Sequence, residues 1–168
     1  MFVFIFFKIT NNLNLIDMKT FLNNGIDIDY SRNQTKKIEK HFSNLNNLEK
    51  HFPKGEFKAN KSGSKANFRF RMHGLNLGVY QITLTKTEKE DEISKTTILR
   101  GYAKDLGLQI DLSIKKFIDT FDNHVEVSVV FEPFKSTLMN ALVADPMILN
   151  SWYITRSIAK MIDEVAYS

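Results

Sequence analysis

Apolar and polar residues alternate through most of the middle of the chain. Residues two positions apart lie on the same face of a β-strand, so each alternating run predicts a strand with one apolar and one polar face. The strand-like runs are residues 26–30, 57–59, 66–72, 80–84, 93–102, 106–114 and 125–131. The pattern therefore predicts a β-sheet of about six or seven strands.

A helical spacing follows the first of these runs. Ser31 is placed to cap a helix whose apolar residues, Ile38 and Phe42, share one face. A second short helix over residues 45–52 should end before Pro53, because proline disfavours a helical conformation in the residue before it. We expect two short helices between the first and second strands.

The C-terminal part of the chain has the spacing of a long helix. Residues 134–144 are apolar, and the Asp145-Pro146 pair predicts a break, with Asp145 as the N-cap of the final helix. The inward stripe of that helix is Ile154, Ile158, Met161, Ile162 and Val165. Charged residues are expected on its other side: Arg156, Lys160, Asp163 and Glu164.

Together these elements predict an α+β fold. Consecutive strands joined by short turns pair most readily as an antiparallel meander. A sheet with one apolar face must cover that face, and the long helix is the large amphipathic element left to do so. We expect a helix-grip architecture, in which a curved antiparallel sheet wraps around the long C-terminal helix.

The N-terminal segment stands apart from this pattern. Residues 1–7 are apolar but far fewer than the ~20 residues of a membrane span, and they lack the features of a signal peptide. Two interpretations stay open: residues 1–17 are an extension upstream of a native start at Met18, or they include an edge strand. We expect residues 18–168 to form one domain, a monomer or a homodimer, without stable membrane insertion.

The amino-acid composition excludes some kinds of chemistry and argues against others. The 168 residues include no cysteine, which excludes disulfides and thiolate chemistry and is typical of a cytoplasmic protein. The four histidines, His41, His51, His73 and His124, are far apart in the sequence, so we expect no metal site and no cofactor. The net charge of +4 is spread along the chain, often beside acidic residues, which argues against nucleic-acid binding.

The element order resembles that of the START-type and birch-pollen-allergen-like superfamily. A first strand runs into Ser31 and is followed by two short helices that end at Pro53. The strands at residues 106–114 and 125–131, a loop and a long closing helix also agree, and the resemblance covers residues 20–168. It implies the helix-grip fold, with a cavity between the sheet and the long helix.

Two details refine this resemblance. The glycine-rich loop of some plant members is absent, and residues 61–64 are at most a remnant of it. The chain length and the lack of cysteine are in keeping with a branch from heat- and acid-loving archaea that is thought to carry fatty acids.

The resemblance implies that the protein binds or carries a hydrophobic small molecule, a fatty acid or another lipid. The residues expected to line its cavity are Tyr30, Phe68, Phe70, Met72, Tyr80, Ile82, Leu108, Ile110, Val127, Val129, Trp152, Thr155, Ile158 and Ile162. Tyrosine hydroxyls, Trp152 and Thr155 would be its polar groups. The alternative is that these residues pack against each other as a solid core, which periodicity cannot distinguish from a hollow one.

An enzyme is a second alternative, because some members of the superfamily are cyclases or dehydratases. The candidate acid–base pairs are His73 with Tyr80 and Asp111 with Arg100. By alternation, His73 and Asp111 face away from the apolar side of their strands, which argues against catalysis.

A protein-interaction module is a third alternative. Arg69, Arg71, Lys95 and Arg100 are expected to cluster on the outer face of the sheet. Such a patch would suit an acidic partner or anionic lipid headgroups, although an ordinary solvated strand face has the same pattern.

Overall fold

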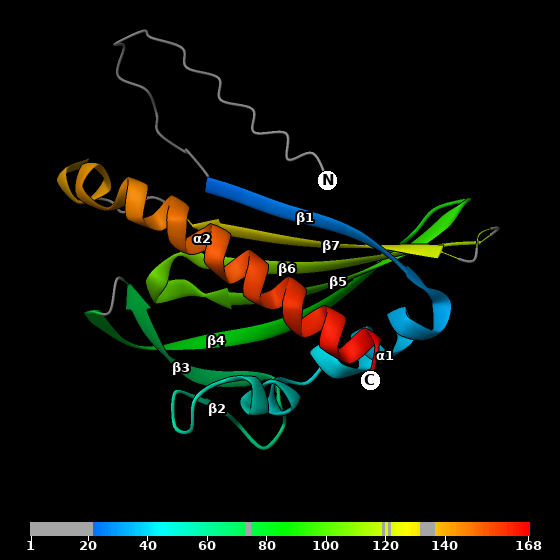
Figure 1. Cartoon of the computed structure of the whole chain (residues 1–168), viewed down its shortest axis with the longest axis horizontal. Helices are drawn as coiled ribbons and strands as arrows, with labels where there is room; N and C mark the ends of the chain where they lie inside the picture. The colour runs from blue at the N-terminus through cyan, green and yellow to red at the C-terminus, as the bar shows by residue number, and fades with distance from the viewer. Residues whose placement is uncertain (1–21, 73–74, 119, 121, 132–136) are drawn as a thin grey trace, which may run out of the picture.

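A curved antiparallel sheet and a long C-terminal helix, α2 (Thr137–Ala166), dominate the fold (Figure 1). The structure, a computed structural model, describes residues 22–72, 75–118, 120, 122–131 and 137–168, with the backbone alone for residues 22–24, 72, 75, 122 and 137–150. The α+β helix-grip prediction is confirmed. Residues 1–17 and His73, on which other predictions rest, lie outside the described residues.

The strands follow the predicted alternation closely. Their bounds are β1 (Leu22–Ser31), β2 (Phe57–Ala59), β3 (Lys65–Met72), β4 (Leu75–Glu90), β5 (Ser94–Ala103), β6 (Leu108–Phe117) and β7 (Asp122–Phe131). The short helices are α1 (Arg32–Phe42) and the 3₁₀ helices η1 (Leu45–His51) and η2 (Lys104–Leu106).

The sheet order is β1-β7-β6-β5-β4-β3-β2, with every pair antiparallel. Strands β2 to β7 form a meander, and β1 pairs with β7. Helices α1 and η1 therefore carry the chain from one edge of the sheet to the other.

Strong curvature closes the sheet around its inner face, the face toward α2. Phe70 on β3 and Phe131 on β7 have ring centroids 6.1 Å apart. Neighbouring strands are ~4.8 Å apart, so a flat sheet would separate β3 from β7 by roughly 19 Å. The curvature therefore lets side chains from opposite sides of the sheet meet over its inner face.

Helix α1 begins as its sequence predicts. The Ser31 hydroxyl accepts a hydrogen bond from the Gln34 backbone N–H, and the Gln34 side chain accepts one from the Ser31 N–H. This reciprocal capping box satisfies two N–H groups that the first turn leaves without partners. Ile38 and Phe42 are buried on one face of the helix, as expected.

The predicted break at Asp145-Pro146 is wrong. Helix α2 runs without interruption through both residues. A proline keeps a helical φ and removes one backbone hydrogen bond, so a helix can continue past it at that cost. The Asp-Pro pair fits a helix start equally well, which is why the sequence misled here.

The predicted hairpin tip between the fourth and fifth strands is also placed too early. Strand β4 extends to Glu90, and the turn comes at residues 91–93. The charged residues of this segment have little strand propensity, but pairing with β5 overrides that preference.

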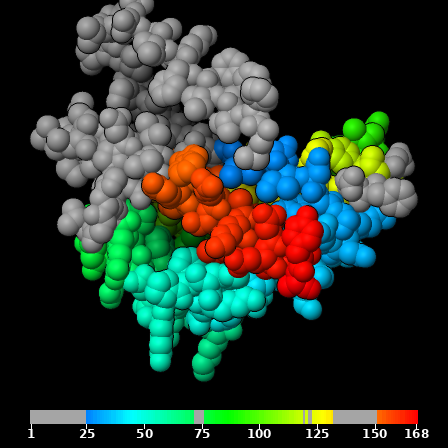
Figure 2. Space-filling view, viewed as in Figure 1, coloured from blue at the N-terminus to red at the C-terminus, as the bar shows by residue number. Residues whose placement is uncertain are grey.

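Helix α2 packs chiefly on β1, β7 and α1. Figure 2 shows its C-terminal half between the β1 side of the molecule and the η1–β2 side. None of the helices in the described part of the chain combines the length and the apolar character that a membrane span requires.

Candidate functional site

The candidate site is the inner face of the sheet, where most of the predicted cavity residues meet. The strand register places Leu108, Ile110 and Leu112 of β6 on the same face as Val129 and Val127 of β7. The register continues across β5 to β4, so Ile82 and Leu84 also belong to this face. The inner face is therefore apolar over most of its width.

Burial of this face is uneven. The predicted cavity residues that are buried are Tyr30, Phe70, Ile82, Leu108, Val127, Val129, Thr155 and Ile162. Those that are half-buried are Phe68, Tyr80, Ile110 and Ile158. Met72 is the last residue of β3, and the structure describes its backbone alone.

The helix contributes a polar as well as an apolar stripe. Thr155, one of the predicted cavity residues, is buried, and its hydroxyl donates a hydrogen bond to the Ser151 carbonyl, 2.7 Å away. Ala159 and Ile162 continue the buried stripe toward the C-terminus. Ser151 and Ala159 were missed by the sequence analysis because small residues carry little hydrophobic signal.

Trp152 is not brought to the inner face with the other predicted residues. Its side chain is 43% exposed and packs edge-on against Tyr153, with ring centroids 5.1 Å apart. The Arg156 guanidinium lies 5.1 Å from the Trp152 ring centroid, a cation–π contact. Position 152 is one residue past the buried Ser151, which turns its side chain away from the buried stripe.

The hydroxyls of the two predicted cavity tyrosines, Tyr30 and Tyr80, already have hydrogen-bond partners. Tyr30 donates a hydrogen bond to the Asp163 carboxylate, 2.6 Å away, and so joins β1 to α2. Burial, followed by the hydrogen bond to Asp163, raises the pKa of Tyr30 above its ordinary value. Tyr80 donates to the Leu77 carbonyl, 3.0 Å away. Asp163 was expected on the solvent side of the helix, so this link was missed.

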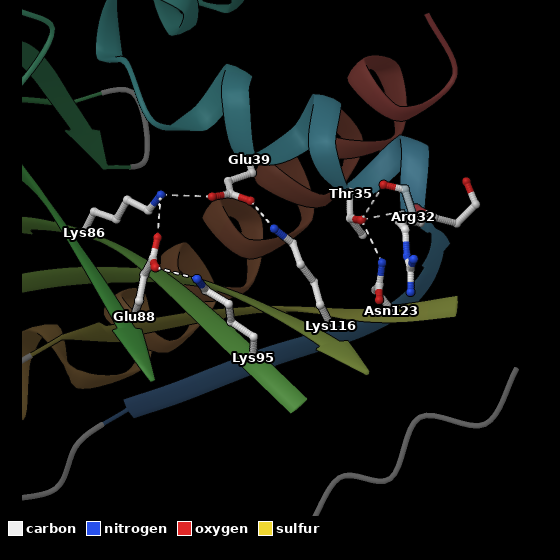
Figure 3. Close-up of polar contacts among 9 residues, drawn as sticks. Arg32, Thr35, Glu39, Lys86, Glu88, Lys95, Lys116 and Asn123 are labelled. Carbon is white, nitrogen blue, oxygen red and sulfur yellow. Dashed lines mark hydrogen bonds and ion pairs between the residues drawn. The ribbon is translucent and has the colours of Figure 1, made fainter. Parts of the chain in front are cut away.

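One corner of the inner face is charged rather than apolar (Figure 3). Glu39 of α1 forms ion pairs with both Lys86 of β4 and Lys116 of β6. Lys86 also contacts Glu88, 2.9 Å away, and Glu88 contacts Lys95 of β5 at 2.9 Å. We call these five residues the charged corner.

The charged corner holds its carboxylates ionised. Burial acts to raise the pKa of Glu39, but hydrogen bonds from Lys116 and Lys86 outweigh it, and the pKa lies below its ordinary value. Hydrogen bonds from Lys86 and then from Lys95 lower the pKa of Glu88 to about 2. The corner was missed because its β4 residues were assigned to a hairpin tip.

A second contact from α1 reaches the sheet beside this corner. The buried Asn123 side chain of β7 donates a hydrogen bond to the Thr35 hydroxyl, 2.9 Å away (Figure 3). The charged corner and this buried bond therefore fix α1 over the end of the sheet.

The predicted basic cluster on the outer face does not form as expected. Lys95 is paired in register with Lys116 and contacts Glu88, so it belongs to the charged corner of the inner face. Arg71 is paired with Glu56 at 2.6 Å. The alternation of β5 was read with the wrong phase at Lys95.

Asp111 and Arg100 do lie on the outer face, as predicted. The Arg100 guanidinium donates two hydrogen bonds to the Asp111 carboxylate, at 2.8 and 2.7 Å. This bidentate pair satisfies both groups away from the inner face. The geometry gives no support to an acid–base role for Asp111.

Two histidines that are ten residues apart in the sequence meet in the fold. The Nε2 atoms of His41 and His51 are 3.2 Å apart, because η1 folds back beside the end of α1. Burial, followed by the positive charge of Lys50, holds the pKa of both imidazoles below the usual range. His51 Nδ1 lies 3.6 Å from the Glu164 carboxylate of α2.

Two surface hollows lie away from α2. One, of about 290 Å³, is lined by Lys58, Ala59, Asn60, Lys65, Ala66, Asn67 and Gln81. The other, of about 510 Å³, is lined by Asn46, Glu49, Lys50, Phe52, Pro53, Lys54, Gly55 and Phe57. Neither hollow has a lining residue from α2, so neither is the predicted cavity.

The element order, the sheet order and the long closing helix are those of the helix-grip fold. No protein-family model matches the chain, and no curated protein sequence matches it.

Solved structures of similar architecture share little sequence with this chain. A START superfamily protein from Mycobacterium smegmatis is 13% identical, with a TM-score of 0.43, over 86% of this chain and 98% of that one. A conserved protein from Geobacillus kaustophilus is 13% identical, with a TM-score of 0.42, over 84% and 94%. The ginseng major latex-like protein 151 from Panax ginseng is 14% identical, with a TM-score of 0.32, over 77% and 98%. At these identities the likeness concerns the fold alone, and the archaeal branch stays a prediction.

Proposed function

We propose that the protein binds or carries a hydrophobic small molecule, a fatty acid or another lipid, between the inner face of the sheet and α2. One observation carries the proposal. Phe68, Tyr80, Leu84 and Ile110 belong to the apolar inner face, yet they are only half-buried. Most large apolar side chains of such a face are expected to be covered, so this part of it has apolar surface left for a ligand.

The position of α2 explains why this surface remains. The helix packs chiefly on β1 and β7, at one side of the sheet, and away from the strands that carry Phe68 and Leu84. On the helix, Ile154, Ile158 and Met161 are also half-buried. A ligand between these two sets of side chains would be surrounded by apolar groups from both the sheet and the helix.

Burial of an apolar tail would be the main favourable contribution to binding. Burying roughly 200 Å² of a lipid tail contributes about 5 kcal/mol, at ~25 cal/mol per Å². This contribution works against the cost of immobilising the ligand. A long aliphatic chain therefore suits the surface better than a small polar metabolite.

A fatty acid is the lipid that the charged corner favours. Leu84 and Lys86 are two residues apart on the same face of β4, so the apolar surface leads directly to an ammonium group. Lys116 lies on the other side of Glu39 from Lys86 (Figure 3). A carboxylate here would share these two cations with Glu39.

A cytoplasmic location stays a prediction.

The direct test is extraction of the purified full chain with organic solvent, followed by mass spectrometry. We expect a co-purified lipid in stoichiometric amount from the wild type. The Leu84→Trp variant should lose it, because a larger side chain fills the proposed space, whereas Thr85→Trp on the exposed side of the same strand should retain it. A clean wild-type extract together with no binding of an added fatty acid would refute the proposal, as would equal lipid content in both variants.

A further inference from the structure

The contact between His41 and His51 suggests a site unrelated to lipid binding. The two rings come from α1 and η1, their centroids are 5.4 Å apart, and their planes cross at 76°. The rings therefore meet edge to edge at their Nε2 atoms rather than stacking. Two imidazole nitrogens this close either share a proton or bind one metal ion together.

The distance between the nitrogens fits a shared metal. Zinc binds histidine nitrogen at 2.0–2.1 Å, so two such ligands at a tetrahedral angle are roughly 3.3 Å apart. The observed separation of the Nε2 atoms is 3.2 Å. The two Nε2 atoms point at each other, so each ring would have to turn for both lone pairs to converge on one ion.

The Glu164 carboxylate lies near the other ring nitrogen of His51. A histidine that binds a metal commonly donates its other ring N–H to a carboxylate, which fixes the tautomer and the ring orientation. His51 Nδ1 lies 3.6 Å from the Glu164 Oε2 atom of α2. With a proton on Nδ1, the lone pair of His51 is on Nε2, the atom that faces His41.

The surroundings of His41 and His51 limit the affinity of this pair for a metal ion. No group of three or more His, Cys, Asp or Glu side chains in the described residues is arranged to hold a metal ion, so water would supply the remaining ligands. The positive charge of Lys50 acts on both imidazoles and opposes a dication, while Glu164 favours one. Both rings are partly exposed, which gives an ion access.

We propose that His41 and His51 form a two-histidine site for a transition-metal dication such as Zn²⁺ or Ni²⁺, with Glu164 as the positioning residue for His51. A bound ion would link α1 to η1 and, through Glu164, to the C-terminal end of α2. It would thus stabilise the end of the molecule where these three helices meet.

The test is calorimetric titration of the untagged full chain with Zn²⁺, with the thermal unfolding midpoint measured alongside. We expect saturable binding of one ion, lost in His41→Gln and in His51→Gln, retained in His124→Gln on β7, and weakened about tenfold in Glu164→Gln. The unfolding midpoint of the wild type should rise with Zn²⁺, and that of His41→Gln should not.

A second measurement does not depend on the variants folding. Zn²⁺ added to the nitrogen-labelled wild type should shift the imidazole signals of two histidines, assigned as His41 and His51. Shifts at His124 instead, retained binding in His41→Gln, or no saturable binding by the wild type would overturn the proposal and leave the contact as a shared proton.

Discussion

Strands β7 and β4 present similar apolar residues to the inner face but are packed very differently. On β7, Val125, Val127, Val129 and Phe131 are each at most 1% exposed. On β4, Ile82 is 7% exposed, but its inner-face neighbours Tyr80 and Leu84 are half-buried, and the face then becomes charged at Lys86. The difference follows from the position of α2, which packs on β7 and not on β4 to a comparable extent.

The two parts of the sheet therefore differ in what their side chains contribute: one part stabilises the fold, and the other is available to a ligand. The side chains under α2 have complete apolar partners, so they supply stability. Tyr80 and Leu84 of β4 and Phe68 of β3 are only partly covered, so they can gain contacts from a ligand without loss of the core.

The largest contrast is expected between two leucines of the inner face. Leu112 is 3% exposed beside Val127 of β7, whereas Leu84 is half-buried on β4. Leu112→Ala should lower the free energy of unfolding by about 2–5 kcal/mol, because it leaves a cavity in a closely packed region. Leu84→Ala should cost about 1 kcal/mol, because that side chain is partly in water already. Urea unfolding measures both, and equal costs would contradict the comparison.

The bond between β1 and α2 should have a smaller effect. Tyr30→Phe removes the hydrogen bond to Asp163 and should lower the free energy of unfolding by about 1–2 kcal/mol, with Asp163 free to regain water. Tyr153→Phe, which changes a tyrosine that is 54% exposed, is the matched control and should cost little.

The Tyr30 effect should also depend on pH. The folded pKa of Tyr30 is raised, so the neutral hydroxyl is favoured in the folded state. Its contribution is complete below the ordinary value of 10.0 and is lost as the pH rises above it, since the unfolded chain then ionises first. The stability difference between the wild type and Tyr30→Phe should therefore shrink above about pH 10. A stability difference between the two proteins that stays constant above this pH would contradict the proposed role of the Tyr30 hydroxyl.

The charged corner should have the smallest effect on stability. Glu39→Gln should lower the free energy of unfolding at pH 7 by about 1 kcal/mol or less, because its lysine partners are partly solvated. The folded pKa of Glu39 is lowered, so its contribution is present above the ordinary value of 4.5 and is lost as the pH falls through the folded pKa.

Unfolding curves of the wild type and Glu39→Gln should therefore converge in acid. Glu126→Gln, on the exposed side of β7, is the control. An effect of Glu39→Gln that persists unchanged well below the ordinary pKa would show that charge pairing is not its cause.

Local patterns in the sequence predicted most of the fold. Period-two alternation placed the strands, and Ser31 as an N-cap placed the start of α1, because each depends on neighbours in the chain. Pro146 misled because a helix start and a helix interior look alike around a proline. Residues 86–90 misled because pairing with β5 decides their conformation.

The candidate site was predicted less completely. Alternation identified the apolar residues of the inner face, but not that Leu84 would be half-buried while Val127 is fully buried, since the position of α2 decides this. The links of Tyr30 to Asp163 and of His41 to His51 depend on how separate elements of the fold pack together. No spacing rule in the sequence contains that information.

The most direct measurement is methyl-group NMR of the labelled wild type during titration with a long-chain fatty acid. We expect saturable shifts of the Leu84, Ile110 and Ile158 methyl signals, with those of Val125 and Val127 nearly unchanged. Shifts confined to exposed residues such as Val79 and Ile93, or no shifts at saturating ligand, would contradict this expectation.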